Sequence, residues 1–88
     1  MKLSENYILK TVAGTAVVVP VGDAVNDIRG MITLNGPAET IWKCLENNMD
    51  YEGIIAQLKV EYDAPEDVLR TDLTAFIDKL KAYKIVTE

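Results

Sequence analysis

The stretch GMITLNGPAETIWKCL, residues Gly30–Leu45, decides the fold because a strand-like segment changes into a helix within it. Residues 31–34 are of types that favour a half-buried strand. Asn35 has a side-chain oxygen that can cap a helix, and Pro37 is acceptable in the first turn of one. The residues that follow at helical spacing and form one apolar face are Ala38, Ile41, Trp42 and Leu45. The chain is therefore strand-like before this junction and helical after it.

The segments before the junction predict two strands joined by a tight turn, followed by a third strand. The runs Tyr7–Val12 and Thr15–Val21 are rich in β-branched and aliphatic residues, and the Ala-Gly pair between them suits a hairpin turn. A polar connection over Gly22–Asp27 leads to the third strand, Ile28–Leu34. Together these segments predict a three-stranded antiparallel sheet.

The segments after the junction predict three helices. The first covers Gly36–Asn47, the second follows Asp50 as its N-cap, and the third covers Pro65–Tyr83 with Pro65 at its first helical position. The third helix has the clearest apolar stripe, which consists of Leu69, Leu73, Phe76, Leu80 and Tyr83. Residues 85–86 can add a short terminal strand or extension. The fold class predicted for residues 1–88 is a single α+β domain.

Length and composition limit the class of protein. The 88 residues suffice for one small domain with a modest core. No apolar run approaches the roughly 18 residues of a membrane helix, and the N-terminus lacks the apolar stretch of a secretory signal. The single cysteine allows no internal disulfide, so we expect a cytoplasmic protein that does not contact membranes. The net charge of −5 repels phosphate backbones, which makes nucleic acid a poor partner.

The residues that usually carry catalysis are missing or have simpler roles. The chain has no histidine, so the commonest general base and metal ligand is absent. Without a histidine to activate it, Cys44 is expected to be an inert, partly buried thiol. The carboxylates Glu66, Asp67 and Asp72 suit the positive end of a helix better than a cation site, and Trp42 suits the core. We expect no catalytic residue, cofactor or metal.

Spaced residues along nearly the whole chain follow the pattern of a known family. In the strand-like half, the matching residues are Ala13, Gly14, Val17, Val18, Val19, Pro20, Leu34 and Asn35. In the helical half, they are Ala38, Ile41, Trp42, Ile54, Ile55, Leu58, Glu61, Tyr62, Asp63, Asp72, Phe76, Leu80 and Ile85. In this pattern the chain resembles the PqqD family, named for pyrroloquinoline quinone synthesis protein D. One departure is Tyr83-Lys84, where family members often have a glycine before the last apolar pair.

The resemblance implies a peptide-recognition domain with a winged helix-turn-helix-like fold. Such domains bind the leader segment of a ribosomally made precursor peptide as an extra strand. They present the rest of that peptide to a modifying enzyme, often a radical SAM enzyme. Strand addition of this kind uses the unpaired backbone groups of a sheet edge. In this chain the edge would be Ile28–Leu34 and the facing helix Pro65–Tyr83.

The candidate binding residues lie on that strand and along the third helix. They are Ile28, Arg29, Gly30, Met31, Ile32, Thr33, Leu34, Arg70, Leu73, Thr74, Ile77 and Lys81. In this interpretation Arg70 and Lys81 attract an acidic leader, while Leu73 and Ile77 take its hydrophobic anchors. The plainer interpretation is that Ile77 packs in the core and both basic side chains are solvated.

Two other functions remain open from the sequence. The fold would allow a winged-helix DNA-binding regulator, although the net charge and the acidic first half of the third helix oppose it. The chain could also be a structural subunit that docks on a larger enzyme through its strand edge. An exposed edge also permits self-pairing into a homodimer.

Overall fold

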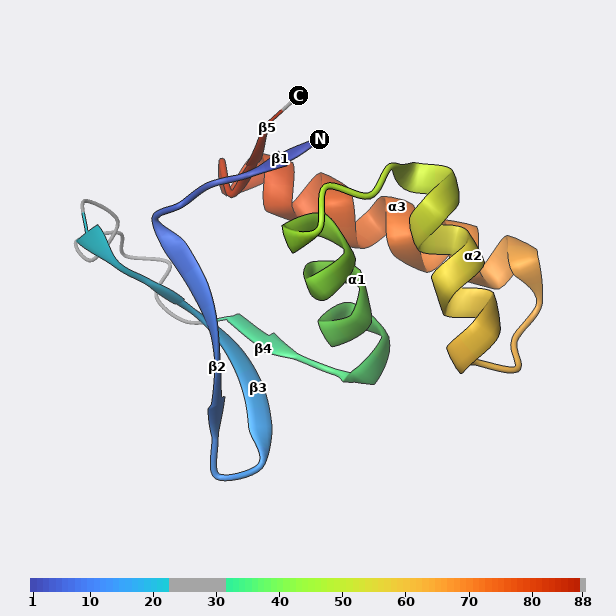
Figure 1. Ribbon diagram of the computed structural model, residues 1–88, viewed down its shortest axis with the longest axis horizontal. Coiled ribbons are helices and arrows are strands. Elements are labelled where there is room, and N and C mark those ends of the chain that lie inside the picture. Colours follow the sequence, from blue (N-terminus) through green and yellow to red (C-terminus); the bar gives the residue numbers. More distant parts are fainter. Residues whose placement is uncertain (23–31, 88) are drawn as a thin grey trace.

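The computed structural model describes residues 1–22 and 32–87, and it has the predicted α+β fold. Figure 1 shows the three helices packed beside one another, with the sheet on the other side of the molecule. In chain order the elements are β1 (Lys2–Leu3), β2 (Tyr7–Val12), β3 (Thr15–Pro20), β4 (Ile32–Leu34), α1 (Gly36–Glu46), α2 (Tyr51–Glu61), α3 (Glu66–Ala82) and β5 (Val86–Thr87).

The predicted hairpin is confirmed as β2 and β3. The two strands pair antiparallel, from Tyr7 opposite Pro20 to Val12 opposite Thr15. The two residues of the turn, Ala13 and Gly14, have φ values of 53° and 80°. Positive φ at both central residues matches the twist of the flanking strands, so the turn closes tightly. β3 ends at Pro20, one residue before the predicted end.

β4 completes an antiparallel sheet with the order β2-β3-β4. Ile32 lies opposite Val18 and Leu34 opposite Ala16. The third strand was expected over Ile28–Leu34. The structure describes its last three residues as β4, and residues 28–31 lie outside the described residues.

Side-chain caps start the first two helices, as the sequence predicted. The amide of Ala38 donates to Asn35 Oδ1 at 2.9 Å, and the amide of Gly53 donates to Asp50 Oδ1 at 2.8 Å. The start of α3 was predicted one residue too early. Pro65 has a ψ of 144°, outside the helical range, so it is the N-cap and α3 begins at Glu66. Among the helices of the described residues, none has the length and apolarity to cross a membrane.

One hydrophobic core joins the sheet to all three helices. Trp42 is 1% exposed, which confirms its expected core role, and Leu73 is fully buried. On α3 the buried residues are Leu69, Leu73, Ile77 and Leu80. Phe76 and Tyr83, which were expected in this stripe, are only half-buried. Phe76 and Ile77 both lie three or four residues from Leu73 and Leu80, so the spacing fits either; in the structure Ile77 is the one that packs in the core.

Two short strands at the chain ends form a second, two-stranded sheet. Lys2 lies opposite Thr87 and Leu3 opposite Val86, and the Ser4 amide donates to the Ile85 carbonyl at 2.7 Å. Figure 1 shows the two ends side by side above α3. A short terminal strand or extension was predicted at residues 85–86, and the structure has a strand at Val86–Thr87. Its partner β1 was not predicted, because two residues are too few to show a period.

We predict that Asn35→Ala lowers the free energy of unfolding by about 1 kcal/mol, because the Ala38 amide loses its acceptor. Asn35→Asp keeps a side-chain oxygen at the same place and should cost clearly less. Equilibrium unfolding in urea, followed by circular dichroism, measures both values. Equal losses in the two variants would show that the cap does not stabilise α1.

Candidate functional site

The hydrogen bonding at the start of the hairpin fixes the direction of the backbone groups in β3. The Val21 amide donates to the Asn6 carbonyl at 2.7 Å, so these two residues form a hydrogen-bonded pair. In an antiparallel ladder such pairs alternate with pairs that are not hydrogen-bonded. The next pair, Pro20 with Tyr7, is of the second kind, which suits a proline because it has no N–H. Val18 lies two residues before Pro20, so its pair with Leu9 is also of the second kind. Val18 therefore points its N–H and C=O away from β2 and toward β4.

The same alternation turns the backbone of Thr33 outward. Ile32 and Leu34 exchange hydrogen bonds with their partners in β3, so Thr33 directs its N–H and C=O away from that strand. No strand lies on this side of β4 among residues 1–22 and 32–87. The side chain of Thr33 is exposed, while those of Ile32 and Leu34 are buried. We call this side of β4 the β4 edge; it offers one backbone donor and one acceptor at Thr33.

A groove of about 350 Å³ begins where β4 ends. Its lining residues are Asn35, Pro37, Ala38, Ile41, Asp72, Ala75, Phe76 and Lys79. We call it the β4–α3 groove. The aliphatic and aromatic side chains form apolar walls, and the half-buried Phe76 is the largest of them. Asp72 and Lys79 add one negative and one positive group on the α3 side. Such a groove suits an apolar side chain of an extended ligand.

Two of the candidate residues on α3 contact α2 and do not line this groove. The Arg70 guanidinium donates to both carboxylate oxygens of Glu52 at 2.8 Å, and it lies 5.6 Å from the centroid of the Tyr51 ring. The Thr74 hydroxyl lies 3.1 Å from the Tyr51 hydroxyl. Arg70 and Thr74 therefore join α3 to α2 on the side of α3 away from Asp72.

The other candidate residues fall into different environments. Leu73 and Ile77 belong to the core, with 0% and 5% of their surface exposed, and Lys81 is half-buried on α3. Residues 28–31 lie outside the described residues, so among the candidate strand residues only Ile32, Thr33 and Leu34 are placed together. A role in peptide binding stays a prediction for all of these residues.

The α3 residues that line the groove were not among the residues predicted to bind a peptide. Asp72, Phe76 and Lys79 are spaced by four and three residues, so they share one side of α3. An aromatic residue between opposite charges at this spacing was the available signal. Phe76 was instead assigned to the core stripe, where the structure places Ile77.

The ion pairs around Arg70 are exposed and connect α2 with α3. Arg70 Nε lies 3.0 Å from Glu66 Oε2, and Lys59 Nζ lies 2.6 Å from Glu66 Oε1. Hydrogen bonds from Arg70 lower the pKa of the Glu52 carboxyl, and those from Lys59 and Arg70 lower the pKa of Glu66. The carboxylates in turn raise the pKa of Arg70. The charged forms of all these groups are therefore stabilised by folding.

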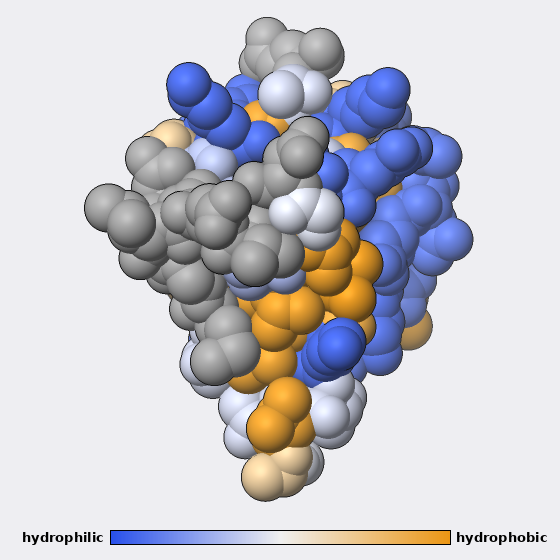
Figure 2. Space-filling view, turned by 90° about the vertical axis from the view of Figure 1, so that its left-hand side faces the viewer, coloured by the Kyte–Doolittle hydropathy of each residue, from blue (hydrophilic) through white to orange (hydrophobic). Residues whose placement is uncertain are grey.

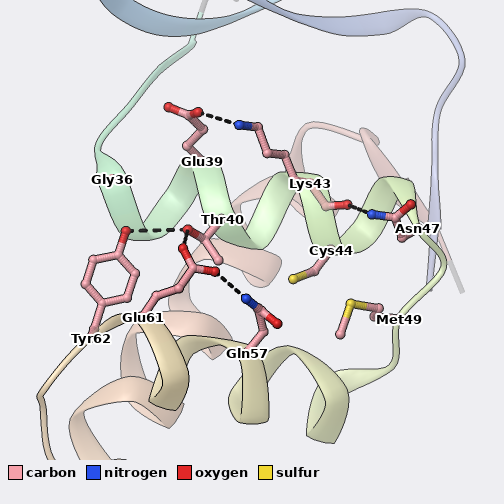
Figure 3. A pocket seen from close by; sticks show the side chains of 10 residues that line it. All are labelled: Gly36, Glu39, Thr40, Lys43, Cys44, Asn47, Met49, Gln57, Glu61 and Tyr62. Carbon is pink, nitrogen blue, oxygen red and sulfur yellow. Dashed lines mark hydrogen bonds and ion pairs between the residues drawn. The ribbon is translucent and has the colours of Figure 1, made fainter.

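A second hollow, of about 410 Å³, lies between α1 and α2 (Figure 3). The Thr40 hydroxyl donates to Glu61 Oε1 at 3.1 Å and lies 3.4 Å from the Tyr62 hydroxyl. Gln57 Nε2 donates to Glu61 Oε2 at 2.6 Å. Cys44 also lines the hollow and is buried. Burial, followed by the charge of Glu61, raises the pKa of its thiol. The thiol therefore stays protonated at neutral pH. The polar side chains of the hollow are hydrogen-bonded to one another, and the bond from Thr40 to Glu61 joins α1 to α2.

The described part of the chain holds no cluster of three or more side chains of the types that usually ligate metals. Glu61 is already hydrogen-bonded to Thr40 and Gln57. The two hollows therefore differ. In the hollow between α1 and α2, polar side chains are hydrogen-bonded to one another. The β4–α3 groove is apolar and lies beside a strand edge.

Comparisons with known proteins agree with this fold. The model of the family described as "Coenzyme PQQ synthesis protein D (PqqD)" matches residues 16–86. A solved structure named "TbiB1 in Complex with the TbiA(beta) Leader Peptide" superposes with a TM-score of 0.77 at 21% sequence identity. The match covers 97% of this chain and 93% of that chain, and at this identity it shows a shared fold. No curated protein sequence matches the chain.

We predict that Arg70→Gln lowers stability more at pH 7 than at pH 3. The lowered pKa values of Glu52 and Glu66 contribute stability above the ordinary pKa of a glutamate, about 4.3. That contribution to stability disappears as the pH falls through the lowered pKa values of Glu52 and Glu66, because the two carboxylates become protonated. Lys79→Gln removes the same charge from the same helix, outside this network, and should show no such difference. Urea unfolding at the two pH values measures it, and an equal loss at both would contradict a role of the ion pairs.

Proposed function

Because this chain belongs to the PqqD family, we propose that it binds the leader segment of a ribosomally synthesised precursor peptide and presents the rest of that peptide to a modifying enzyme. The observation that carries the proposal is the pair of outward-directed backbone groups of Thr33 beside an apolar groove. The fold is shared with a protein whose structure was solved with a leader peptide. The residue types and the edge geometry both suit an extended peptide.

In the proposed complex the leader extends the sheet by one strand at the β4 edge. A leader residue opposite Thr33 accepts a hydrogen bond from its N–H and donates one to its C=O. Because side chains alternate along a strand, every second leader side chain points to the same face of the extended sheet. One of these reaches the apolar walls formed by Ile41 and Phe76. Backbone bonds then give affinity, and this side chain gives specificity.

The charges of the groove favour a particular kind of leader. Asp72 and Lys79 are seven residues apart on α3, which places them about 10 Å apart along the helix axis. The apolar side chain of Phe76 lies between them on the same side. The preferred leader therefore carries an aliphatic or aromatic anchor with a basic group toward Asp72 and an acidic group toward Lys79.

The proposal gives this chain no catalytic step. The chemistry belongs to the modifying enzyme, which we expect to be a radical SAM enzyme, as is common for partners of this family. Leader, binding protein and enzyme then act together in the cytoplasm. Holding the leader raises the effective concentration of the attached core segment at the enzyme.

We predict that Thr33→Pro weakens leader binding about tenfold or more while the protein still folds. Proline removes the backbone N–H that would donate a hydrogen bond to the leader, and its ring crowds the β4 edge. That N–H takes no part in the β3–β4 ladder, so the sheet loses no internal bond. Isothermal titration calorimetry with synthetic leaders, taken from short open reading frames beside the gene, measures the affinity.

The matched control is Thr33→Ala, which shortens the same exposed side chain but keeps the backbone donor. It should bind the leader nearly as well as the unchanged protein. Circular dichroism and urea unfolding show whether both variants fold. If a folded Thr33→Pro protein bound the leader as tightly as Thr33→Ala, strand addition at the β4 edge would be wrong.

A further inference from the structure

The direction in which a leader runs along the β4 edge follows from the hydrogen bonds at Thr33. A single leader residue that bonds to both the N–H and the C=O of Thr33 forms an antiparallel pair with it. The two pairings inside the sheet are antiparallel as well. A leader bound in this way runs opposite to β4.

α3 and such a leader run in the same direction. Figure 1 shows β4 and α3 running in opposite directions, so a strand antiparallel to β4 is parallel to α3. From its N-terminus to its C-terminus the leader passes Asp72 first, then Phe76 and then Lys79, all of which line the β4–α3 groove. The leader therefore meets an acidic, an aromatic and a basic side chain in that order.

The pairing also determines which leader side chains point toward the helices. Side chains alternate between the two faces of a sheet. We call the leader residue opposite Thr33 position 0; its side chain points to the same face as the exposed side chain of Thr33. Position −1 lies opposite Leu34 and position +1 opposite Ile32, and these two residues are buried in the core. Positions −3, −1 and +1 therefore point to the helix side.

The spacing of these positions resembles the spacing of the groups on α3. Two residues of a strand span about 7 Å. Along the helix axis, Asp72 and Phe76 are about 6 Å apart, and Phe76 and Lys79 about 4.5 Å. A side chain at position −1, beside Leu34, can then reach Phe76, with position −3 toward Asp72 and position +1 toward Lys79. The flexible stems of charged side chains make up the remaining difference.

The charges of Asp72 and Lys79 are available to a ligand. Both side chains are exposed. Within the described residues neither forms a hydrogen bond or an ion pair, whereas Lys59 and Arg70 are paired with carboxylates. A bound leader can therefore pair with both groups without breaking an existing interaction.

The outer face of the sheet adds no charged contact at this edge. Figure 2 views the molecule from the side of the sheet and shows an apolar band that runs down to the hairpin turn. Ile8 and Val12, with 37% and 54% of their surface exposed, belong to β2, and β3 separates β2 from β4. Of the described β4 residues, only the uncharged Thr33 has an exposed side chain. Position 0 of the leader therefore carries no charge requirement.

We propose that the chain selects leaders in which a basic, an apolar and an acidic residue follow one another in this order from the N-terminus, with one residue of any type between each. The basic residue at position −3 pairs with Asp72, the apolar residue at −1 packs on Phe76, and the acidic residue at +1 pairs with Lys79. The selection rests on the proposed binding of a leader at the β4 edge, and it adds the order and spacing of the residues that are recognised.

Two synthetic peptides of identical composition test the order. One contains Lys-Thr-Leu-Thr-Glu and the other Glu-Thr-Leu-Thr-Lys, each between the same flanks of serine and threonine. Their net charges are equal, so the protein's net charge of −5 attracts or repels both alike at long range. We expect the first peptide to bind about tenfold more tightly, because it forms two charge pairs where the second meets two like charges. Titration of the isotope-labelled protein, followed by nuclear magnetic resonance, measures both affinities.

The double variant Asp72→Lys with Lys79→Asp exchanges the two charges and keeps the net charge of the protein. It should prefer the second peptide, and circular dichroism shows whether it folds. The proposal would be overturned if both proteins preferred the same peptide, if the two peptides bound equally, or if neither bound at millimolar concentration.

The proposed function is tested separately, by the leaders encoded beside the gene and the Thr33→Pro variant. A leader that lacks the basic, apolar and acidic order but binds at Thr33 would overturn the selection and leave the proposed function standing.

Discussion

The alternation of hydrogen bonds in the sheet is the constraint on which the candidate site depends. At one end of the hairpin, Val21 and Asn6 form a hydrogen-bonded pair, whereas Pro20 has no N–H and its pair with Tyr7 is not hydrogen-bonded. The alternation continues from β2 through β3 to β4, so the N–H and C=O of Thr33 point outward, away from β3. A shift of one residue would turn Thr33 toward β3 and move Ile32 and Leu34 out of the core. Core packing and the outward direction of the Thr33 backbone therefore depend on the same register.

The helices complete the site by keeping one side of α3 available to a ligand. Leu73 and Ile77 anchor α3 in the core. Arg70 joins it to α2 through Glu52. The opposite side of α3, with Phe76, is left beside the end of β4. Exposed ion pairs contribute little free energy, but here they hold the Arg70 side chain against α2.

Local chemistry made much of the fold predictable from sequence. The hairpin, the caps at Asn35 and Asp50 and the three helices each follow from a few neighbouring residues. The face of α3 was harder, because Phe76 and Ile77 both fit an apolar stripe and only tertiary packing decides between them. For the same reason the sequence could not show that Arg70 pairs with α2. The pairing of β1 with β5 joins the two ends of the chain, which no local pattern can show.

The most direct test of peptide binding at the β4 edge is nuclear magnetic resonance of the isotope-labelled protein during titration with a synthetic leader. We expect the Thr33 amide to shift strongly and to become protected from hydrogen exchange, and the amides of Phe76 and Lys79 to shift with it. Amides of Arg70 and Thr74, on the other side of α3, should change little. Peptide binding at the β4 edge would be wrong if a leader binds and shifts the Arg70 and Thr74 amides while the Thr33 amide stays unchanged.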